Sequence, residues 1–257
     1  MSPSDPLALS FDDVSVVRGG RLIWSDGTFD VPAGGTYAVI GTSGSGKTTL
    51  LHAVLGTIPT ASGEIRVFGE PPGAATAMIG YVPQNYAAAA GDAVRARDAV
   101  LLGLTGNRWG FGRARAEQRR AVDEILARVD ATEFASRRLS QLSGGQRQRI
   151  AIAEALVSKP RLLILDEPLT ALDVRNQRAI VSLLAKIKDE FDVTILVVAH
   201  DLNPLLRILD GAIYLLDEHA HFDTMDEVVD EALLTHLYGT SIEVVHTPQG
   251  ELYMRSV

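Results

Sequence analysis

One segment constrains the fold of this chain more than any other: the glycine-rich stretch Gly41–Thr48, which directly follows the apolar run Thr36–Ile40. Its sequence, GTSGSGKT, fits the pattern G-x-x-x-x-G-K-S/T in full. Glycines let the backbone curl so that successive amide N–H groups point inward, and a helix that begins at the loop adds the partial positive charge of its N-terminus. A buried strand, this loop and a helix together bind phosphate groups. The segment therefore predicts an α/β fold that binds a nucleoside triphosphate; a chance glycine-rich turn is the alternative, and the flanking strand and helix argue against it.

The loop pattern also predicts roles for single side chains. Lys47 is expected to reach the β- and γ-phosphates, and the Thr48 hydroxyl is expected to ligate Mg²⁺. The residues predicted to bind the nucleotide at this loop are Gly41, Thr42, Ser43, Gly44, Ser45, Gly46, Lys47, Thr48 and Thr49.

A second pattern supplies acidic groups. The run Leu162–Leu165 predicts a buried strand, and two carboxylates, Asp166 and Glu167, follow it directly. Asp166 can hold the hydration shell of Mg²⁺, and Glu167 can act as the general base that polarises an attacking water. A strand with acidic end residues is the plainer interpretation of this segment alone, and the phosphate-binding loop upstream favours the catalytic one.

Two more polar residues follow predicted strands. Gln84 follows Met78–Val82, and His200 follows Val193–Val198. A glutamine at the first place could contact Mg²⁺ or the attacking water. His200 lies at the carboxyl edge, where parallel sheets bind ligands, and this favours a functional histidine. A surface glutamine and a structural histidine are the ordinary interpretations when each is taken alone.

Strand and helix signals alternate along much of the chain, which predicts a parallel sheet with both faces covered. The region of about 90–157 is expected to be a helical insert. Turns are expected at Asp26-Gly27 and over 32–35. The other expected strands are Leu9–Val17, Thr28–Val31, Glu64–Phe68 and Ala212–Leu216, and the expected helices are Thr48–Gly56, Ala87–Ala90, Arg95–Leu104, Arg113–Val129, Ser143–Val157, Val174–Lys188 and the acidic Asp226–Glu231.

Composition narrows the class of protein. The 257 residues carry a net charge of −8, which argues against a nucleic-acid partner, and the chain has no cysteine, which excludes disulfides and thiolate metal sites. The first residues, Met1–Leu9, lack the basic and apolar parts of a signal peptide. The longest apolar runs fall far short of the roughly 20 residues of a membrane span, so no span is expected.

The segment Leu142–Gln146, with sequence LSGGQ, decides among nucleotide-binding classes. Ser143 is placed to cap a helix whose first residues are glycines, which makes a second anion-binding helix N-terminus. One γ-phosphate has no evident need of two such sites from one molecule. A dimer in which each chain covers the nucleotide of the other would use both.

The order of these motifs resembles the nucleotide-binding subunits of ATP-binding cassette (ABC) transporters over nearly the whole chain. The resemblance implies an α/β fold with a P-loop NTPase core, a mostly parallel sheet, N-terminal antiparallel β strands and a helical subdomain. It implies a single domain over 1–257, with a core of about 1–88 and 158–240, the helical subdomain at about 89–157 and a C-terminal extension, 241–257.

The resemblance also implies site roles. Two copies would enclose two ATP molecules, so that the signature residues of one chain face the γ-phosphate held by Lys47 of the other. Asp173 would lie at the dimer seam, and Glu167 and His200 would be catalytic. The signature residues are Ser143, Gly144, Gly145 and Gln146, and the implied ligands of Mg²⁺ are Thr48, Gln84 and Asp166.

The implied partners are a second copy of the chain, an integral membrane permease and, indirectly, a solute-binding protein, at the inner face of the cell membrane. Stretches such as Ile79–Gln84, Asp98–Gly103 and Leu237–Gly239 resemble ATPases of manganese, zinc and iron importers. An iron-chelate importer and a soluble ABC ATPase of iron–sulfur assembly remain alternatives. A P-loop kinase is a further alternative, which the LSGGQ segment disfavours; repair and translation ATPases are disfavoured by the short insert and the single cassette.

Three features depart from the family pattern: Arg18, Glu154 and the bland segment Asn85–Ala90 that follows Gln84. Arg18 occupies the place where the family usually stacks an aromatic ring on adenine, and a guanidinium can also stack there. Glu154 stands where relatives usually carry arginine. His219 and His221 offer metal-ligand types, and we expect a solvated hairpin turn there instead.

Overall fold

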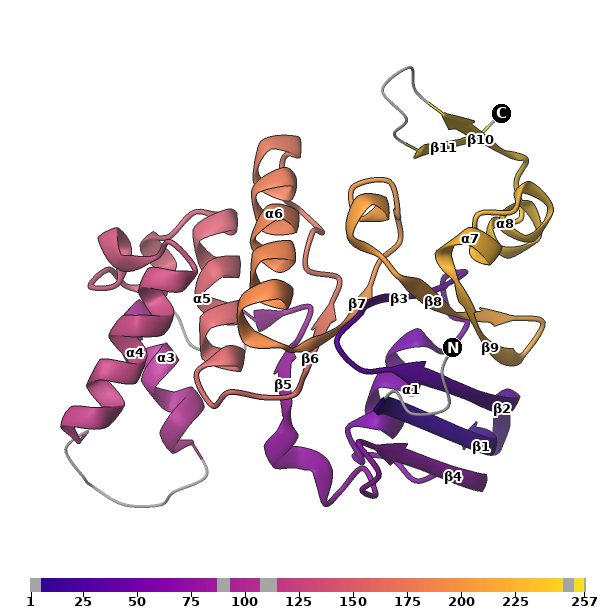
Figure 1. The fold of residues 1–257 in the computed structure, drawn as a ribbon, viewed down its shortest axis with the longest axis horizontal. Helices are drawn as coiled ribbons and strands as arrows, with labels where there is room; N and C mark the ends of the chain where they lie inside the picture. The colour runs from indigo at the N-terminus through magenta and orange to yellow at the C-terminus, as the bar shows by residue number, and fades with distance from the viewer. Residues whose placement is uncertain (1–5, 87–92, 107–114, 247–251, 257) are drawn as a thin grey trace.

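The computed structural model describes residues 6–86, 93–106, 115–246 and 252–256. Its centre is a nine-stranded sheet with the strand order β4-β1-β2-β9-β8-β3-β7-β6-β5, shown in Figure 1. In the described part of the chain, none of the helices is long and apolar enough to cross a membrane.

Five neighbouring strands of this sheet run parallel. In spatial order they are β8 (Gly211–Leu216), β3 (Thr36–Gly41), β7 (Thr194–Val198), β6 (Leu162–Asp166) and β5 (Ile79–Val82). Every residue of β3, β6 and β7 is buried. Their unbroken apolar runs arise because elements cover both faces of a parallel sheet.

Antiparallel strands complete the sheet. β1 (Leu7–Arg18) pairs with β2 (Arg21–Pro32) on one side and β4 (Ser62–Val67) on the other. β9 (His219–Thr224) is antiparallel to β8 and meets β2 through one parallel bridge.

Helices cover the two faces of the sheet over separate apolar cores. The helix α1 (Lys47–Val54) packs on one face. On the other side lie α3 (Ala96–Thr105), α4 (Ala116–Arg128) and α5 (Gly144–Leu156), which contact one another and lie together beside α6 (Val174–Phe191) in Figure 1.

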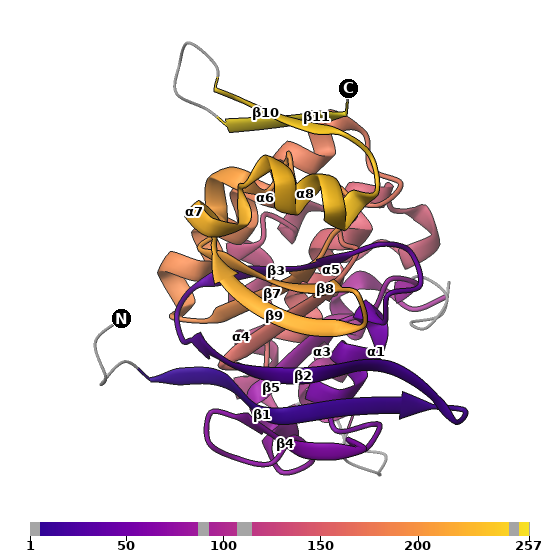
Figure 2. The same cartoon turned by 90° about the vertical axis from the view of Figure 1, so that its right-hand side faces the viewer.

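The C-terminal part lies on the side of the sheet away from β1 and β4. It comprises α7 (Met225–Val228), α8 (Glu231–Tyr238) and a hairpin of β10 (Ile242–His246) and β11 (Leu252–Ser256). Figure 2 shows the hairpin beyond α7 and α8.

The predicted fold class is confirmed, while several local predictions are wrong or untested. Asp26-Gly27 is not a turn but part of a bulge inside β2, where Asp26 takes a φ of 54°, and the strand begins well before the predicted Thr28. The acidic stretch Asp226–Glu231 is not one helix, because α7 ends at Val228 and the carboxylate of Asp230 caps α8. The predicted helix at Ala87–Ala90 lies outside the described residues.

Candidate active site

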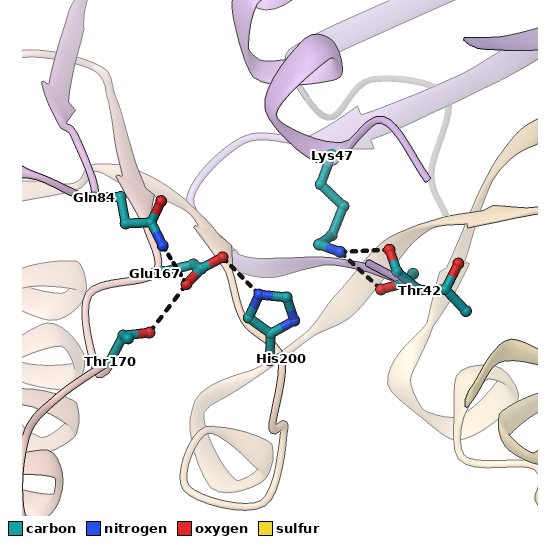
Figure 3. Close-up of polar contacts among 7 residues, drawn as sticks. Thr42, Lys47, Gln84, Glu167, Thr170 and His200 are labelled. Carbon is teal, nitrogen blue, oxygen red and sulfur yellow. Dashed lines mark hydrogen bonds and ion pairs between the residues drawn. The ribbon is translucent and has the colours of Figure 1, made fainter. Parts of the chain in front are cut away.

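The carboxyl ends of four parallel strands bring the predicted polar residues to one edge of the sheet. The strand order β3-β7-β6-β5 places the loop after β3, His200 after β7, Glu167 after β6 and Gln84 after β5 in the same sequence along this edge. Figure 3 shows Lys47, His200, Glu167 and Gln84 in that order. Residues far apart in the chain thus form one site.

The glycine loop is tightly seated between β3 and α1. Gly41 has a φ of 151°, and a Cβ there would lie 2.6 Å from Ser45 Oγ. Gly46 takes a φ of 103° as the N-cap of α1, and a Cβ there would lie 2.4 Å from Ile23 Cγ2. Side chains at these two positions would collide with the loop itself and with β2, so the loop requires glycine at both.

Lys47 is the buried cation of the loop, with 6% of its surface exposed. Its ammonium donates to the carbonyl oxygens of Gly41 at 2.8 Å and Thr42 at 2.9 Å, as Figure 3 shows. Burial lowers the pKa of Lys47, and the carboxylates of Glu167 and Asp166 oppose that shift. The ammonium is therefore a partly desolvated donor that interacts strongly with an anion.

Glu167 is the centre of a hydrogen-bonded cluster. Its Oε2 accepts from Gln84 Nε2 at 2.7 Å and from the Thr170 hydroxyl at 3.1 Å, and its Oε1 lies 2.6 Å from His200 Nε2 (Figure 3). The Glu167 side chain is 13% exposed and that of His200 is 50% exposed. Glu167 also has a φ of 51°, a left-handed conformation that is costly for a non-glycine residue and recurs at functional sites.

Asp166 is the buried carboxylate of the site, with 6% of its surface exposed. Burial raises its pKa, and the adjacent charge of Glu167 adds to the rise, while His52, Tyr81 and Lys47 act in the opposite direction. Tyr81 lies beside Asp166, and burial together with this carboxylate raises the pKa of the phenol. The ionised form of Asp166 is thus held at a cost to folding, as expected of a residue kept for a ligand.

This cost leads to a stability prediction for Asp166→Asn. Because the carboxyl group has a higher pKa in the folded chain than in the unfolded one, ionisation of Asp166 reduces stability as the pH rises above the ordinary value of 3.8. The variant lacks this ionisation, so its free energy of unfolding in urea should exceed that of the parent at pH 7 and the difference should shrink toward pH 4. A variant less stable than the parent at pH 7 would contradict the account.

The signature segment begins α5 through a capping box. Ser143 Oγ accepts from the Gln146 amide at 3.3 Å, and Gln146 Oε1 accepts from the Ser143 amide at 3.1 Å. A Cβ on Gly145 would lie 2.5 Å from Asn176 Oδ1, and a Cβ on Gly144 would lie 3.1 Å from Leu172 Cδ2. The two glycines therefore let α5 approach the start of α6 closely.

Asp173 lies at the start of α6, close to the two glycines of the signature segment. As the N-cap of α6, its carboxylate accepts from the Asn176 backbone amide and from Asn176 Nδ2, both at 2.8 Å. These hydrogen bonds lower the pKa of Asp173, with the backbone amide as the largest cause. Asn176 thus joins Asp173 to the signature glycines within one chain.

The remaining predicted positions lie elsewhere. Arg18 is exposed at the end of β1, opposite Arg21 across the turn Gly19-Gly20. Glu154 accepts a hydrogen bond from the hydroxyl of Tyr86 at 2.5 Å. His219 pairs with Asp26 at 2.7 Å, and among the described residues there is no group of metal-ligating side chains around it.

The donor set at the sheet edge fits a nucleoside triphosphate with Mg²⁺. The glycine cradle around Lys47 suits phosphate oxygens, and oxygen atoms of Thr48, Asp166 and Gln84 are the hard ligands that Mg²⁺ prefers. Thr42, Ser43, Gly44 and Thr48 are exposed on the loop, and Thr49 is buried beneath it. The sequence analysis missed Tyr81, Thr170 and Asn176. Of these, only Thr170 had a signal in the sequence: it lies three residues after Glu167, at a spacing where its hydroxyl can donate to that carboxylate.

Comparisons with known proteins agree with this geometry. The family model described as ABC transporter matches residues 25–170. The zinc transport system ATP-binding protein TroB of Treponema pallidum is 33% identical over 95% of this chain and 91% of its own length. The manganese transport system ATP-binding protein MntB of Bacillus subtilis is 32% identical over 90% of this chain and 92% of its own. A solved structure of a metal-chelate type ABC transporter in an inward-facing conformation has a TM-score of 0.85 at 28% identity and covers 98% of this chain and 97% of that one.

Proposed function

We propose that this chain, which belongs to the ABC transporter family, is the subunit that powers import of a divalent metal ion, namely manganese, zinc or iron. Membership of the family makes the chain an ATP-binding protein and an ATP hydrolase. The observation that carries the catalytic part is the cluster in which Glu167 contacts Gln84 and His200 at the sheet edge that also holds Lys47.

In this mechanism Glu167 is the general base. Its carboxylate takes a proton from the water that attacks the γ-phosphorus in line with the leaving oxygen. Lys47 binds the β- and γ-phosphate oxygens by exchanging its bonds to Gly41 and Thr42 for them. His200, beside Glu167 Oε1, donates to a γ-phosphate oxygen and stabilises the charge that spreads there. Thr48, Asp166 and Gln84 hold Mg²⁺, which when bound neutralises charge on the phosphate oxygens.

The site is completed by a second copy of the chain. Ser143, Gly144, Gly145 and Gln146 form the start of α5, and their helix N-terminus carries the partial positive charge that suits a γ-phosphate. Asn176 holds Asp173 beside them, so one chain would present its signature and Asp173 as a unit to the nucleotide held by the other. Arg18 is proposed to lie near the adenine.

The membrane partner is an integral permease, with a solute-binding protein acting through it and with no nucleic acid involved. The chain is then one ABC ATPase domain held at the inner face of the membrane, with helices α3, α4 and α5 in its helical subdomain. The names of TroB and MntB support a metal cargo. The metal-chelate type transporter supports an iron-chelate as the second candidate.

Cellular metal content tests the cargo. A strain that carries Glu167→Gln in place of the parent chain should hold less manganese, zinc or iron in metal-poor medium, and only the affected metal should restore growth. A deficit that appears only when iron is given as a chelate would favour the second candidate. Unchanged contents of all three metals would contradict both, and co-purification with iron–sulfur assembly proteins in place of a permease would support the soluble alternative.

A further inference from the structure

The side chain of Asn203 binds the C-terminal hairpin (β10 and β11) through two hydrogen bonds. Asn203 Nδ2 donates to the Met254 carbonyl oxygen at 2.9 Å, and the Met254 amide donates to Asn203 Oδ1 at 2.8 Å. In an antiparallel pair the N–H and C=O of one residue point to the same side. The Met254 groups therefore face away from β10, and Asn203 takes the place of a neighbouring strand at this edge.

Asn203 lies three residues after His200, in the segment Ala199–Leu205, which we term the His200 loop. Leu202 and Leu205 are fully buried and fix the far end of this loop in the core. The Asn203 amide donates to Asp201 Oδ1 at 2.9 Å, so the residue next to His200 is tied to Asn203 as well. The contacts thus run from Met254 through Asn203 to Asp201, the residue next to His200.

The end of α8 lies close enough to Asp201 to be affected by its charge. Tyr238, the last residue of α8, has a pKa raised to about 12 by burial and by the negative charge of Asp201. Met254 itself is buried, with 7% of its surface exposed. The end of α8 and the hairpin thus both lie near the His200 loop, which carries the half-exposed imidazole.

We propose that Asn203 is a positioning residue: its two bonds to Met254 let the C-terminal hairpin fix the His200 loop, so that His200 points at Glu167 and the γ-phosphate. The proposal rests on the role of His200 given under the proposed function. It assigns a task to the C-terminal extension that the nucleotide motifs leave without one. A misplacement of about 1 Å in a reacting group can slow a reaction by up to about 100-fold.

The test is steady-state ATP hydrolysis by the full chain carrying Asn203→Ala. We expect kcat to fall about tenfold while KM for ATP stays within about twofold, because the loop moves but the phosphate-binding loop does not. Asn203→Ala should have no further effect in a His200→Ala background, since the two residues act through one group. Arg255→Ala, which removes the exposed ion pair with Glu243 on the same hairpin, is the matched control and should keep the parent kcat.

A second pair of variants tests the same two hydrogen bonds by changing Met254 in the hairpin. Met254→Pro removes the amide that donates to Asn203, whereas Met254→Ala removes only the side chain; kcat should fall in the proline variant well below that of the alanine variant. Equal kcat in those two variants, or additive effects of Asn203→Ala and His200→Ala, would mean that the bonds only anchor the chain terminus and would overturn the proposal. A parent-like kcat in His200→Ala would overturn the role of His200 itself, and this inference with it.

Discussion

Replacing Glu167 by glutamine is expected to lower kcat for ATP hydrolysis by about 10²- to 10⁴-fold, the range that a positioned general base contributes. The amide has the shape of the carboxylate and can still meet Gln84, Thr170 and His200, but it cannot take the proton of the attacking water. The affinity for ATP should therefore change little. Steady-state hydrolysis and ATP titration of the same preparation measure the two quantities.

Glu190→Gln is the matched control for this variant. Glu190 forms a surface ion pair with Arg128 at 2.7 Å, so the same chemical change there should leave kcat unaltered. If Glu167→Gln hydrolysed ATP at the parent rate, another group would be the base, and the role given to the cluster around Glu167 would be wrong.

Replacing Lys47 by alanine should weaken ATP binding by about 100-fold or more. Hydrogen bonds to charged groups contribute about 1.5–3 kcal/mol each, and the ammonium has two carbonyl partners in the loop that it is expected to exchange for phosphate oxygens. The loss should be larger for the triphosphate than for adenosine, because the lysine acts on phosphate charge. Titration with a fluorescent ATP analogue and with adenosine measures both affinities.

Lys186→Ala serves as the control for Lys47, because Lys186 lies on the surface and donates a long hydrogen bond to the Arg128 carbonyl oxygen at 3.4 Å. Circular dichroism establishes whether the Lys47 variant remains folded, since Gly41 and Thr42 lose a donor. A folded Lys47→Ala chain with the parent affinity for ATP would exclude the phosphate contact.

Much of the fold could be predicted from the sequence, because the local hydrophobic patterns agree with the burial of the strands in the structure. The apolar runs Thr36–Ile40 and Leu162–Leu165 are buried strands in the structure, and their unbroken hydrophobicity reflects a sheet covered on both faces. Asp26-Gly27 misled the prediction because the same residue types serve turns and bulges, and only the pairing of β2 with β1 decides between them.

The candidate site was predictable as a set of motifs but not as a set of contacts. Parallel strands end at one edge, so Gln84, Glu167 and His200 could be expected near one another from their places in the sequence. The closeness of Tyr81 to Asp166 and the bonds from Asn203 to Met254 depend on tertiary packing between segments far apart, and no spacing in the sequence indicates them. The pair Asp173 and Asn176 was missed for a different reason. Its hydrogen bonds form an ordinary helix cap, and only the tertiary contact of Asn176 with Gly145 connects that cap to the signature segment.

The most direct test of the central claim, that two copies of this chain complete one another's ATP site, is the molar mass of Glu167→Gln in solution with and without ATP and Mg²⁺. Light scattering on a sizing column should give the chain mass of 27.6 kDa without nucleotide and about twice that value with it. The double variant Ser143→Arg with Glu167→Gln should bind ATP but stay at the single-chain mass, because the arginine blocks the face that meets the partner's γ-phosphate. A Glu167→Gln chain that binds ATP and remains at 27.6 kDa, or a dimer that persists in the double variant, would contradict the account.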